Sequence, residues 1–393
     1  MTAEIVQIVQ ELSTVGGAET VALELARAFN RAGLSNCVIA SSVGAGVGGD
    51  AKIERIGASL AKIPTRGLLR HIGRFLVVPL FTLAATRAVW RRQRSVIVSH
   101  GDSLKGDVLV VHAVNAQNLK EKRRSNSWVW MLNPIHLWVA WRDRWMIGGL
   151  RYRIYVAVSP RVETELRLYY NVPPSRIRVI PNGIDLARFN RDPSAGRAIR
   201  REFGIPDDAK LLLFVGHEFR RKGLEYAIAA LERLDSNVRL LVVGSDSQAM
   251  YRRMAKTSGD RLIFAGSRSD MPAFYAAADA LVLPTNYETF SLVCMEAMAA
   301  SLPVFATPVG GIEDYLVDGV NGYQIAWDGE DIAKKISAVF ADPALFDALC
   351  KGARQTALKY GWDEVASQYI ALLEQIDAAK NPTPLGGLSP QPV

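Results

Sequence analysis

The chain has 393 residues, a length that suits two domains better than one hydrophobic core. Its 49% hydrophobic and 22% charged residues are typical of a globular protein and exclude a disordered or fibrous chain. The formal net charge of +8 favours an anionic partner, such as a nucleotide, a phospholipid, an anionic glycan or a nucleic acid. Three widely spaced cysteines, Cys37, Cys294 and Cys350, predict neither a disulfide framework nor a metal site and favour a reducing compartment.

Strand-length apolar runs alternate with helical segments along the first part of the chain. Residues 4–10 begin with an acidic residue and predict a first strand rather than a signal peptide. A helix is expected from residue 18, and further strands are expected at 36–42, 96–99, 108–111, 154–159 and 177–181. This alternation is typical of a parallel sheet whose strands are joined by right-handed helical crossovers.

The same pattern starts again after the sequence PNGID at 181–185. Strands are expected at 210–216, 238–244, 261–266, 280–284 and 302–307. We therefore predict an α/β protein with two Rossmann-like domains, at 1–182 and 183–362, that face each other across a cleft. The last helix, at 363–380, is expected to pack back on the first domain. The Pro- and Gly-rich residues 381–393 predict a disordered tail.

Two glutamates, Glu288 and Glu296, stand in an otherwise apolar stretch after the fourth strand of the second series. A buried carboxylate is costly without a partner, and this stretch predicts a strand-to-helix turn at the ligand-binding edge of a sheet. If the helix starts near Phe290 or Ser291, its free N–H groups suit a phosphate. Glu296 would then lie ~7.5 Å along the axis, near a ribose, while Glu288 would face the group beyond the phosphate. The alternative is that Glu288 is simply exposed and Glu296 is structural.

Two further turns favour the same kind of ligand. Arg221, Lys222 and Gly223 follow the first strand of the second series, and two cations beside a helix start suit a diphosphate. Gly16 and Gly17 follow the first strand of the chain, where glycine lets the backbone approach a ligand closely. Taken singly, the first turn could be a solvated basic loop and the second a simple reversal of the chain.

Four features occur in a fixed order: GGAE at 16–19, IPNGID at 180–185, RKG at 221–223 and two glutamates separated by seven residues. In this order they resemble the retaining glycosyltransferases with the GT-B fold, the fourth family of the glycosyltransferase classification. The resemblance covers nearly the whole chain and is strongest from 178 to 325. It implies transfer of a sugar from a nucleotide-sugar, with a UDP-sugar expected. It implies no obligatory metal and no other cofactor, and the chain has no D-x-D pair.

The resemblance also implies roles for individual residues. Glu296 matches the family's ribose-binding glutamate, and Glu288 matches the glutamate that contacts the donor sugar beside its reacting face. Arg221 and Lys222 match the cations that bind the diphosphate. The loop that closes over the diphosphate and the turn that offers it backbone N–H groups comprise Gly16, Gly17, Thr289, Phe290, Ser291 and Leu292.

His112 is similar to a first-domain histidine near the donor sugar in many family members, and with Glu288 it is a candidate catalytic residue. His100 is the rival candidate, and a histidine at a strand end often has only a structural role. The chain departs from the family pattern at two places. His217 replaces the arginine that often follows the first strand of the second domain, and the sequence ETFS at 288–291 replaces EGFG or EPFG.

Two basic and apolar segments predict contact with a membrane surface. In the first, Arg66, Arg70 and Arg74 share one face of a helix that is apolar opposite, the pattern of an interfacial helix. The apolar residues of that helix are Leu68, Leu69, Ile72, Phe75 and Leu76. The second segment, 120–145, places tryptophans, which favour the membrane–water boundary, among arginines. These are Trp128, Trp130, Trp138, Trp141 and Trp145. Both uncharged runs fall short of the ~20 residues that span a bilayer, and the alternative is that both segments are core helices.

We therefore expect a metal-independent retaining hexosyltransferase, peripheral on the cytoplasmic face of the membrane. Its first domain would bind a glycan or glycolipid acceptor, such as a lipopolysaccharide core, lipid-linked or exopolysaccharide precursor, and its second domain the nucleotide-sugar. Two alternatives remain: a GT-B relative such as a nucleotide-sugar epimerase, and a non-catalytic membrane-binding protein. No nucleic-acid-binding module is recognisable, so no nucleic-acid partner is expected.

Overall fold

The computed structural model describes residues 3–13, 16–44, 47–49, 51–57, 59, 60, 63, 70–124 and 135–382, without the side chains of 70–72, 74, 118 and 121–124. By its contacts the chain forms two compact units. Unit 1 comprises Met1–Ala157, Glu163–Ile180 and Val365–Val393, and unit 2 comprises Val158–Val162 and Pro181–Glu364. Each unit is built on one main parallel sheet, as the sequence predicts.

Seven parallel strands form the sheet of unit 1, in the order β5-β3-β1-β6-β7-β8-β9. They are β1 (Ile5–Ile8), β3 (Asn36–Ala40), β5 (Ile53–Arg55), β6 (Val96–Ser99), β7 (Val108–Val111), β8 (Ile154–Ala157) and β9 (Ile177–Val179). The central strands are buried along their whole length, because helices cover parallel sheets, and this burial explains their continuous apolar runs. A separate parallel pair joins β2 (Glu11–Leu12) to β4 (Ser42–Val43).

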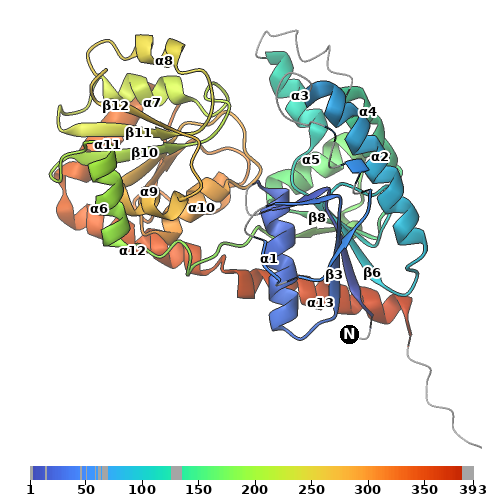
Figure 1. Ribbon diagram of the computed structural model, residues 1–393. Helices are drawn as coiled ribbons and strands as arrows, with labels where there is room; N and C mark the ends of the chain where they lie inside the picture. Colours follow the sequence, from blue (N-terminus) through green and yellow to red (C-terminus); the bar gives the residue numbers. More distant parts are fainter. Residues whose placement is uncertain are drawn as a thin grey trace, which may run out of the picture. The chain divides into compact units, whose positions relative to one another are not determined.

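The helices of unit 1 connect these strands (Figure 1). They are α1 (Ala18–Arg31), α2 (Arg70–Trp90), α3 (Asn115–Arg124), α4 (Ile135–Asp143), the π-helix Arg144–Gly148 and α5 (Pro160–Tyr170). Helix α4 packs against both α2 and α3. The two segments that the sequence assigns to a membrane surface therefore belong to neighbouring helices, although residues 64–69 and 125–134 lie outside the described part of the chain.

Six parallel strands form the sheet of unit 2, in the order β12-β11-β10-β13-β14-β15. They are β10 (Lys210–Val215), β11 (Val238–Val243), β12 (Leu262–Gly266), β13 (Ala280–Leu283), β14 (Val304–Ala306) and β15 (Gly322–Gln324). The helices are α6 (Pro193–Glu202), α7 (Leu224–Leu231), α8 (Ala249–Met254), α9 (Met271–Ala277), α10 (Leu292–Ala299), α11 (Gly329–Ala341) and α12 (Pro343–Leu358). The five predicted strands are confirmed, and β15 is an additional short strand.

The strand order of unit 2 positions its candidate site. The chain builds β10, β11 and β12 outward in one direction and then returns to place β13 on the other side of β10. Open α/β sheets bind ligands where the strand order reverses in this way, beyond the carboxyl ends of the strands. The turns that follow β10 and β13 are the two turns that carry Arg221, Lys222 and Glu288.

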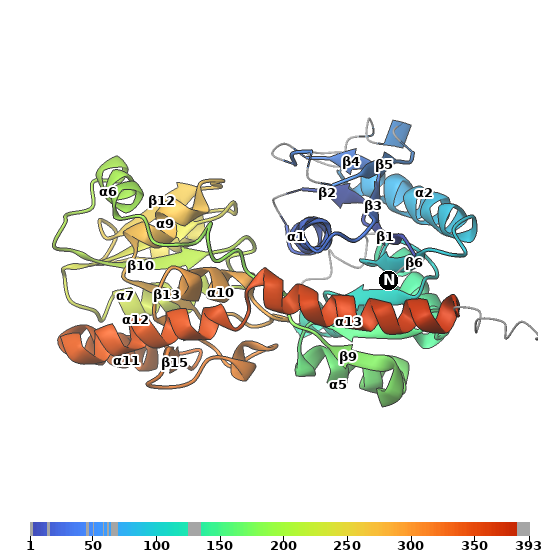
Figure 2. The same ribbon diagram turned by 90° about the horizontal axis from the view of Figure 1, so that it is seen from below.

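The last helix, α13 (Trp362–Lys380), packs against unit 1 from residue 365 onward (Figure 2). Its contacts are with residues that precede strands: Lys380 Nζ donates to Ser95 O and to Asp107 Oδ2, both at 2.7 Å, and Ala3 N donates to Asp377 Oδ2 at 3.2 Å. The helix therefore crosses the amino ends of β1, β6 and β7. Residues 383–393 of the predicted tail lie outside the described part of the chain.

Candidate donor and transfer site

The turns after β10 and β13 are joined by hydrogen bonds into one surface. Asn286 N donates to Arg221 O at 2.9 Å, and Arg221 Nη1 donates in return to Tyr287 O at 3.0 Å. The Asn286 side-chain amide also reaches Arg220 O at 3.2 Å. Because the bonds run in both directions, the position of each turn depends on the other. The predicted diphosphate cations therefore lie beside the predicted sugar-binding turn.

Lys222 and Glu288 form an ion pair through Lys222 Nζ and Glu288 Oε1. The two side chains are only 10% and 11% exposed, and Thr285 Oγ1 donates to the same carboxylate oxygen at 3.3 Å. A charge pair with so little water around it is stable only while both partners remain, because either charge alone would be desolvated without compensation. The structure thus joins two residues to which the sequence assigns separate contacts with the ligand.

Two glycines allow neighbouring loops to approach this pair. Gly223 precedes α7 with a φ of 75°, and a Cβ there would collide with the backbone oxygen of Pro284 at the end of β13. Gly310 follows β14 with a φ of 56°, and a Cβ there would collide with the backbone oxygen of Glu288. Only glycine meets both demands without strain. Three loops of unit 2 therefore meet at Glu288.

Ser291 is the N-cap of α10 and adopts the left-handed conformation, with φ 64° and ψ 84°. The helix begins at Leu292, which agrees with the expectation of a start near 290 or 291. The Oγ of Ser291 does not cap the helix but donates to Cys294 Sγ at 3.3 Å. The left-handed backbone explains why glycine suits this position in the pattern that the chain resembles. A serine in place of glycine removes none of the backbone N–H groups at the start of α10.

The two residues between Glu288 and Ser291 are held in place by contacts with the rest of unit 2. Phe290 is buried, its ring packs against Tyr315 and Tyr360, and its backbone oxygen accepts a hydrogen bond from Tyr315 OH at 2.7 Å. Thr289 is partly exposed, and its backbone oxygen lies against Gly311. These contacts fix the backbone of the turn at Phe290, while the Thr289 side chain stays partly exposed.

Glu296 lies on α10, little more than one turn after its start. Its Oε2 accepts a hydrogen bond of 2.7 Å from the buried hydroxyl of Tyr275. Burial raises the pKa of the Glu296 carboxyl to about 7, although the Tyr275 hydrogen bond and the charges of Arg188 and Lys222 oppose the rise. Near neutral pH the group therefore exists in both forms, one that accepts hydrogen bonds from hydroxyls and one that can also donate.

His217 occupies the position of the expected arginine. Its Nδ1 accepts a hydrogen bond from Ser245 N at 3.1 Å and faces Ser245 Oγ at 3.0 Å. An acceptor Nδ1 requires the proton of the neutral ring to be on Nε2. The exposed side chain therefore offers a single N–H donor instead of a guanidinium. Arg221, the nearby cation, is also bound to Glu218 Oε2 at 2.8 Å.

In unit 1, Gly16 and Gly17 lead into α1, and Gly17 is its N-cap. Gly16 has a φ of 116°, in the region that favours glycine, and a Cβ there would meet the Glu19 carboxylate at 2.5 Å. At Gly17 the space around a Cβ is open. The neighbouring residues 14 and 15 lie outside the described part of the chain, so the proposed closure of this loop over a diphosphate remains a prediction.

His100 and His112, which the sequence presents as rivals, contact each other. They follow the adjacent strands β6 and β7, and His100 Nδ1 lies 3.0 Å from His112 Nε2 with the rings stacked at 5.3 Å. Burial lowers the pKa of His112 to about 4. Burial and, to a lesser extent, His112 hold the pKa of His100 well below its usual value. Both imidazoles are therefore neutral at physiological pH.

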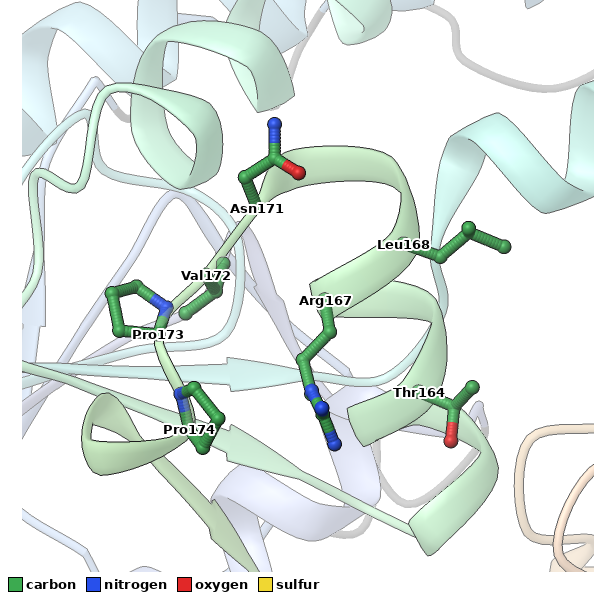
Figure 3. Close-up of a pocket in the computed structure, with 7 residues that line it drawn as sticks. All are labelled: Thr164, Arg167, Leu168, Asn171, Val172, Pro173 and Pro174. Carbon is green, nitrogen blue, oxygen red and sulfur yellow. The ribbon is translucent and has the colours of Figure 1, made fainter.

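Sequence reasoning did not identify the partners of these site residues. Ser245, Tyr275 and Thr285 come from three different connections, so only the folded sheet order brings them to the site. A separate open hollow lies on unit 1, on α5 and the turn that follows it (Figure 3). It is lined by Thr164, Arg167, Leu168, Asn171, Val172, Pro173 and Pro174, and it shares no residue with the candidate site.

Comparisons with known proteins identify the family of the chain. The family "Glycosyltransferase Family 4" matches residues 15–188, and the family "Glycosyl transferases group 1" matches residues 196–356. A D-inositol 3-phosphate glycosyltransferase of Xylanimonas cellulosilytica is 34% identical over 237 residues, which are 56% of each protein. The chain thus spans about half the length of the curated relatives that it matches.

Two solved structures share the fold. WaaG, a glycosyltransferase involved in lipopolysaccharide biosynthesis, has a TM-score of 0.74 at 21% identity, covering 96% of this chain and all of the WaaG chain. Anabaena Alr3699/HepE in complex with UDP and glucose has a TM-score of 0.70 at 18% identity, covering 95% of this chain and all of the other. These similarities confirm the predicted GT-B fold class. Together the two family matches cover most of the sequence, and the chain belongs to Glycosyltransferase Family 4.

Proposed function

We propose that this chain is a retaining, metal-independent hexosyltransferase that moves a sugar from a nucleotide-sugar, in particular a UDP-sugar, to a glycan or glycolipid acceptor. The observation that carries the proposal is the junction of two turns, which gathers Arg221, Lys222, Glu288 and the start of α10. Family membership supports the proposal, as does the shared fold of a protein crystallised with UDP and glucose.

In this proposal the diphosphate lies against Arg221, Lys222 and the N–H groups at residues 289–292, and Gly16 and Gly17 cover it. Glu296 accepts the ribose hydroxyls. Because Lys222 is already paired with Glu288, an arriving diphosphate competes for the ammonium group. The carboxylate of Glu288 is then released to bind hydroxyls of the donor sugar. The ion pair therefore keeps both charges satisfied until the donor is present.

The proposed reaction breaks the bond between sugar C1 and the diphosphate and forms a bond from the acceptor oxygen on the same face. The departing diphosphate gains negative charge, which Arg221 and Lys222 stabilise. Glu288 positions the sugar through its hydroxyls. His112, neutral because burial lowers its pKa to about 4, contacts the sugar or acceptor as a hydrogen-bonding group.

Nucleotide binding and nucleotide release together test this function. UDP at one hundred times its dissociation constant should stabilise the protein by about 2.7 kcal/mol, whereas uridine should do so only at much higher concentration. With a UDP-sugar and truncated lipopolysaccharide as acceptor, free UDP should appear only in the complete mixture. An epimerase would instead yield a new nucleotide-sugar without UDP. Absence of stabilisation by UDP and by every other nucleoside diphosphate would overturn the proposal.

Variants separate the proposed roles of the two glutamates. Glu296→Ala should weaken UDP binding by roughly 10- to 100-fold, because a hydrogen bond to a charged group contributes ~1.5–3 kcal/mol. Glu288→Gln should lower turnover more than UDP affinity, because its ligand is the sugar. Isothermal titration with UDP and a steady-state transfer assay measure the two effects. Unchanged UDP affinity in Glu296→Ala would place the ribose elsewhere.

We also propose that unit 1 attaches the enzyme to the cytoplasmic face of a membrane that carries a lipid-linked or lipopolysaccharide acceptor. Large apolar side chains are exposed on α2, on its neighbour α4 and on the π-helix that follows α4. They are Phe75, Leu76, Leu80, Leu83, Trp90, Leu137, Trp141 and Trp145, here called the apolar patch. Arg151 stands over the Trp145 ring and Lys105 over the Trp90 ring, so cations accompany two of these tryptophans.

Several residues of the expected membrane-binding segments lie outside the described part of the chain. Arg66, Leu68, Leu69, Trp128 and Trp130 are outside the described residues, and the side chains of Arg70, Ile72 and Arg74 are not described. Trp138 is only partly exposed. Among the helices that the structure describes, none is both long and apolar enough to cross a bilayer. We propose that attachment through the apolar patch is peripheral.

Vesicle flotation tests this attachment. The chain should float with vesicles that contain anionic lipid and should be released by high salt, because each basic residue near the surface contributes about 1 kcal/mol. Replacing Leu80, Leu83 and Leu137 together by serine should abolish flotation without affecting UDP binding. The control is Leu168→Ser, which changes an exposed leucine outside the apolar patch. Equal flotation of the triple variant and the control would contradict the assignment.

A further inference from the structure

A chain of three buried or half-buried polar side chains runs across the centre of the unit 1 sheet. Gln7 lies in β1, His100 follows β6 and His112 follows β7, and these three strands are adjacent in the sheet. Gln7 Oε1 lies 3.0 Å from His100 Nε2, and His100 Nδ1 lies 3.0 Å from His112 Nε2. Gln7 is fully buried and His100 is nearly so, while His112, the last residue of this hydrogen-bonded series, is partly exposed.

The hydrogen bonds in this series must all point the same way, from donor to acceptor. A neutral imidazole has one N–H donor and one acceptor nitrogen, so each histidine must pass on the role that it receives. If Gln7 accepts from His100, then His100 accepts from His112, and His112 carries its proton on Nε2. If Gln7 donates to His100, then His100 donates to His112, and His112 carries its proton on Nδ1. The orientation of one amide thus decides which nitrogen of His112 is the donor.

The surroundings of Gln7 favour the second arrangement. With Oε1 facing His100, Nε2 is buried without a hydrogen-bond partner among the described residues. That orientation leaves both N–H donors of a fully buried amide unsatisfied. Rotating the amide by half a turn puts Nε2 on His100, so that one N–H and the carbonyl oxygen, instead of two N–H groups, lack a partner. Buried unpaired carbonyls are better tolerated than buried unpaired N–H groups, and the two orientations have the same shape.

We propose that Gln7 donates through His100 and holds His112 as the Nδ1–H tautomer, so that His112 offers the bound sugar or acceptor a hydrogen-bond donor rather than a base. Gln7 and His100 are then positioning residues for the transfer, and this part of the proposal rests on the proposed function. His112 forms no hydrogen bond with the described residues other than the one to His100, so its Nδ1 is the nitrogen left for a ligand.

The chemical consequence is specific. An Nδ1–H group can stabilise a developing negative charge or fix a lone pair on a substrate oxygen, but it cannot take a proton from an acceptor hydroxyl. The low pKa of both rings fits this role, because burial keeps them neutral and a neutral chain preserves its direction. The proton of the acceptor hydroxyl would therefore leave to the departing diphosphate oxygen and not to His112.

Nitrogen NMR of the unmodified protein provides the direct test. The chain has five histidines, so selective ¹⁵N-histidine labelling gives few signals, and loss of signals in His100→Gln and His112→Gln assigns the pair. We expect His112 Nδ1 and His100 Nδ1 to be protonated and both Nε2 atoms to be acceptors. The opposite pattern, with both Nε2 atoms protonated, overturns the inference whatever the transfer activity.

Variants of Gln7 show whether it sets the direction. The Gln7→Glu variant is studied at about pH 8.5, which is about four units above the ordinary pKa of glutamate and two above that of histidine. An ionised carboxylate can only accept a hydrogen bond from a neutral His100, so it should move the His112 proton to Nε2. Transfer should fall by roughly 10-fold, about the value of one hydrogen bond, with UDP affinity unchanged. Gln7→Met should give a mixture of tautomers. A single Nδ1–H tautomer in Gln7→Met would show that another group sets the direction and would also overturn the inference.

Two controls separate this inference from the proposed function. Asn36→Asp places a carboxylate at another buried amide of the same sheet and reports the general cost of burying that charge. It should leave the His112 spectrum and the transfer rate relative to folded protein unchanged. Full transfer activity in His112→Gln would refute the catalytic role of His112 while the tautomer measured in the unmodified protein still stands.

Discussion

Ser291 carries local strain at the start of α10. A residue with a Cβ loses roughly 1–2 kcal/mol in the left-handed conformation that Ser291 adopts at φ 64°. We therefore predict that Ser291→Gly leaves the fold intact and raises the free energy of unfolding by about 0.5–1 kcal/mol, after the greater freedom of glycine in the unfolded chain is subtracted. Urea unfolding measures the change. The control Ser247→Gly, at a position without a positive φ, should be destabilising, and a similar result for both serines would argue against strain.

Glu296 should make stability depend on pH. Its carboxyl has a pKa of about 7 in the folded chain against an ordinary value of 4.5, so the folded state holds a proton that the unfolded state has lost. The resulting stabilisation is complete below pH 4.5 and disappears as the pH rises through 7, at about 1.4 kcal/mol per unit of pKa shift. Glu296→Gln, which cannot ionise, should lack this loss. Unfolding midpoints from pH 5 to 8 measure it, and parallel curves for the two proteins would refute the raised pKa.

The sequence identifies these residues but does not predict the contacts that they make. Glu288, Glu296 and Lys222 stand out by charge in apolar or turn segments, so composition alone marks them. That Lys222 binds Glu288 cannot be read from the chain, because the two are separated by β11, β12, β13 and the helices between them. The pairing of His100 with His112 likewise depends on β6 and β7 being neighbours.

At the scale of elements, strands that lie within longer apolar runs were predictable, and short strands outside such runs were not. β10 and β11 have six residues each and follow the expected pattern, because central parallel strands are buried on both faces. β15 has three residues and β2 and β4 have two each, too few to show a periodicity. The start of α10 was predictable within one or two residues, because the preceding strand and its polar turn leave few positions where the helix can begin.

The junction of the turns after β10 and β13 predicts strong coupling between Lys222 and Glu288. Lys222→Met or Glu288→Gln alone leaves one poorly hydrated charge without its partner and should destabilise the protein by about 3 kcal/mol. The double variant removes both charges and should be less destabilised than the sum of the single effects by about 1–3 kcal/mol. Urea unfolding of all four proteins measures this coupling. Additive effects would mean that the ion pair does not contribute to joining the turns.

At the scale of the whole molecule, the chain ends on the unit where it began. Helix α13 starts in unit 2 and continues along unit 1, where it meets residues that precede β1, β6 and β7. Its contacts lie at the amino ends of these strands, whereas His100 and His112 follow their carboxyl ends. The anchor of the last helix and the candidate transfer residues therefore occupy opposite edges of the same sheet, and changes at the anchor can be separated from changes in chemistry.

Asp107 holds this anchor in place. Its side chain is 6% exposed, forms ion pairs with Lys380 at 2.7 Å and Arg153 at 3.3 Å, and accepts a hydrogen bond from Ile97 N. Lys380→Met should lower the stability of unit 1 by about 1.5–3 kcal/mol, because it removes a charged hydrogen bond from a buried carboxylate. Arg153→Met should cost less than 1 kcal/mol, because the arginine is 56% exposed and water replaces it.

Because two units can unfold separately, the Lys380 experiment needs a signal from each. Hydrogen exchange at the amides of β6 and β7 should report the loss in unit 1, and exchange in β10 and β13 should stay as in the unmodified protein. UDP affinity should not change, since every residue that we assign to the diphosphate or ribose in unit 2 is retained. An equal loss of protection in both sheets would mean that the two units unfold as one, and an equal cost for the Arg153 and Lys380 variants would remove the special role of α13.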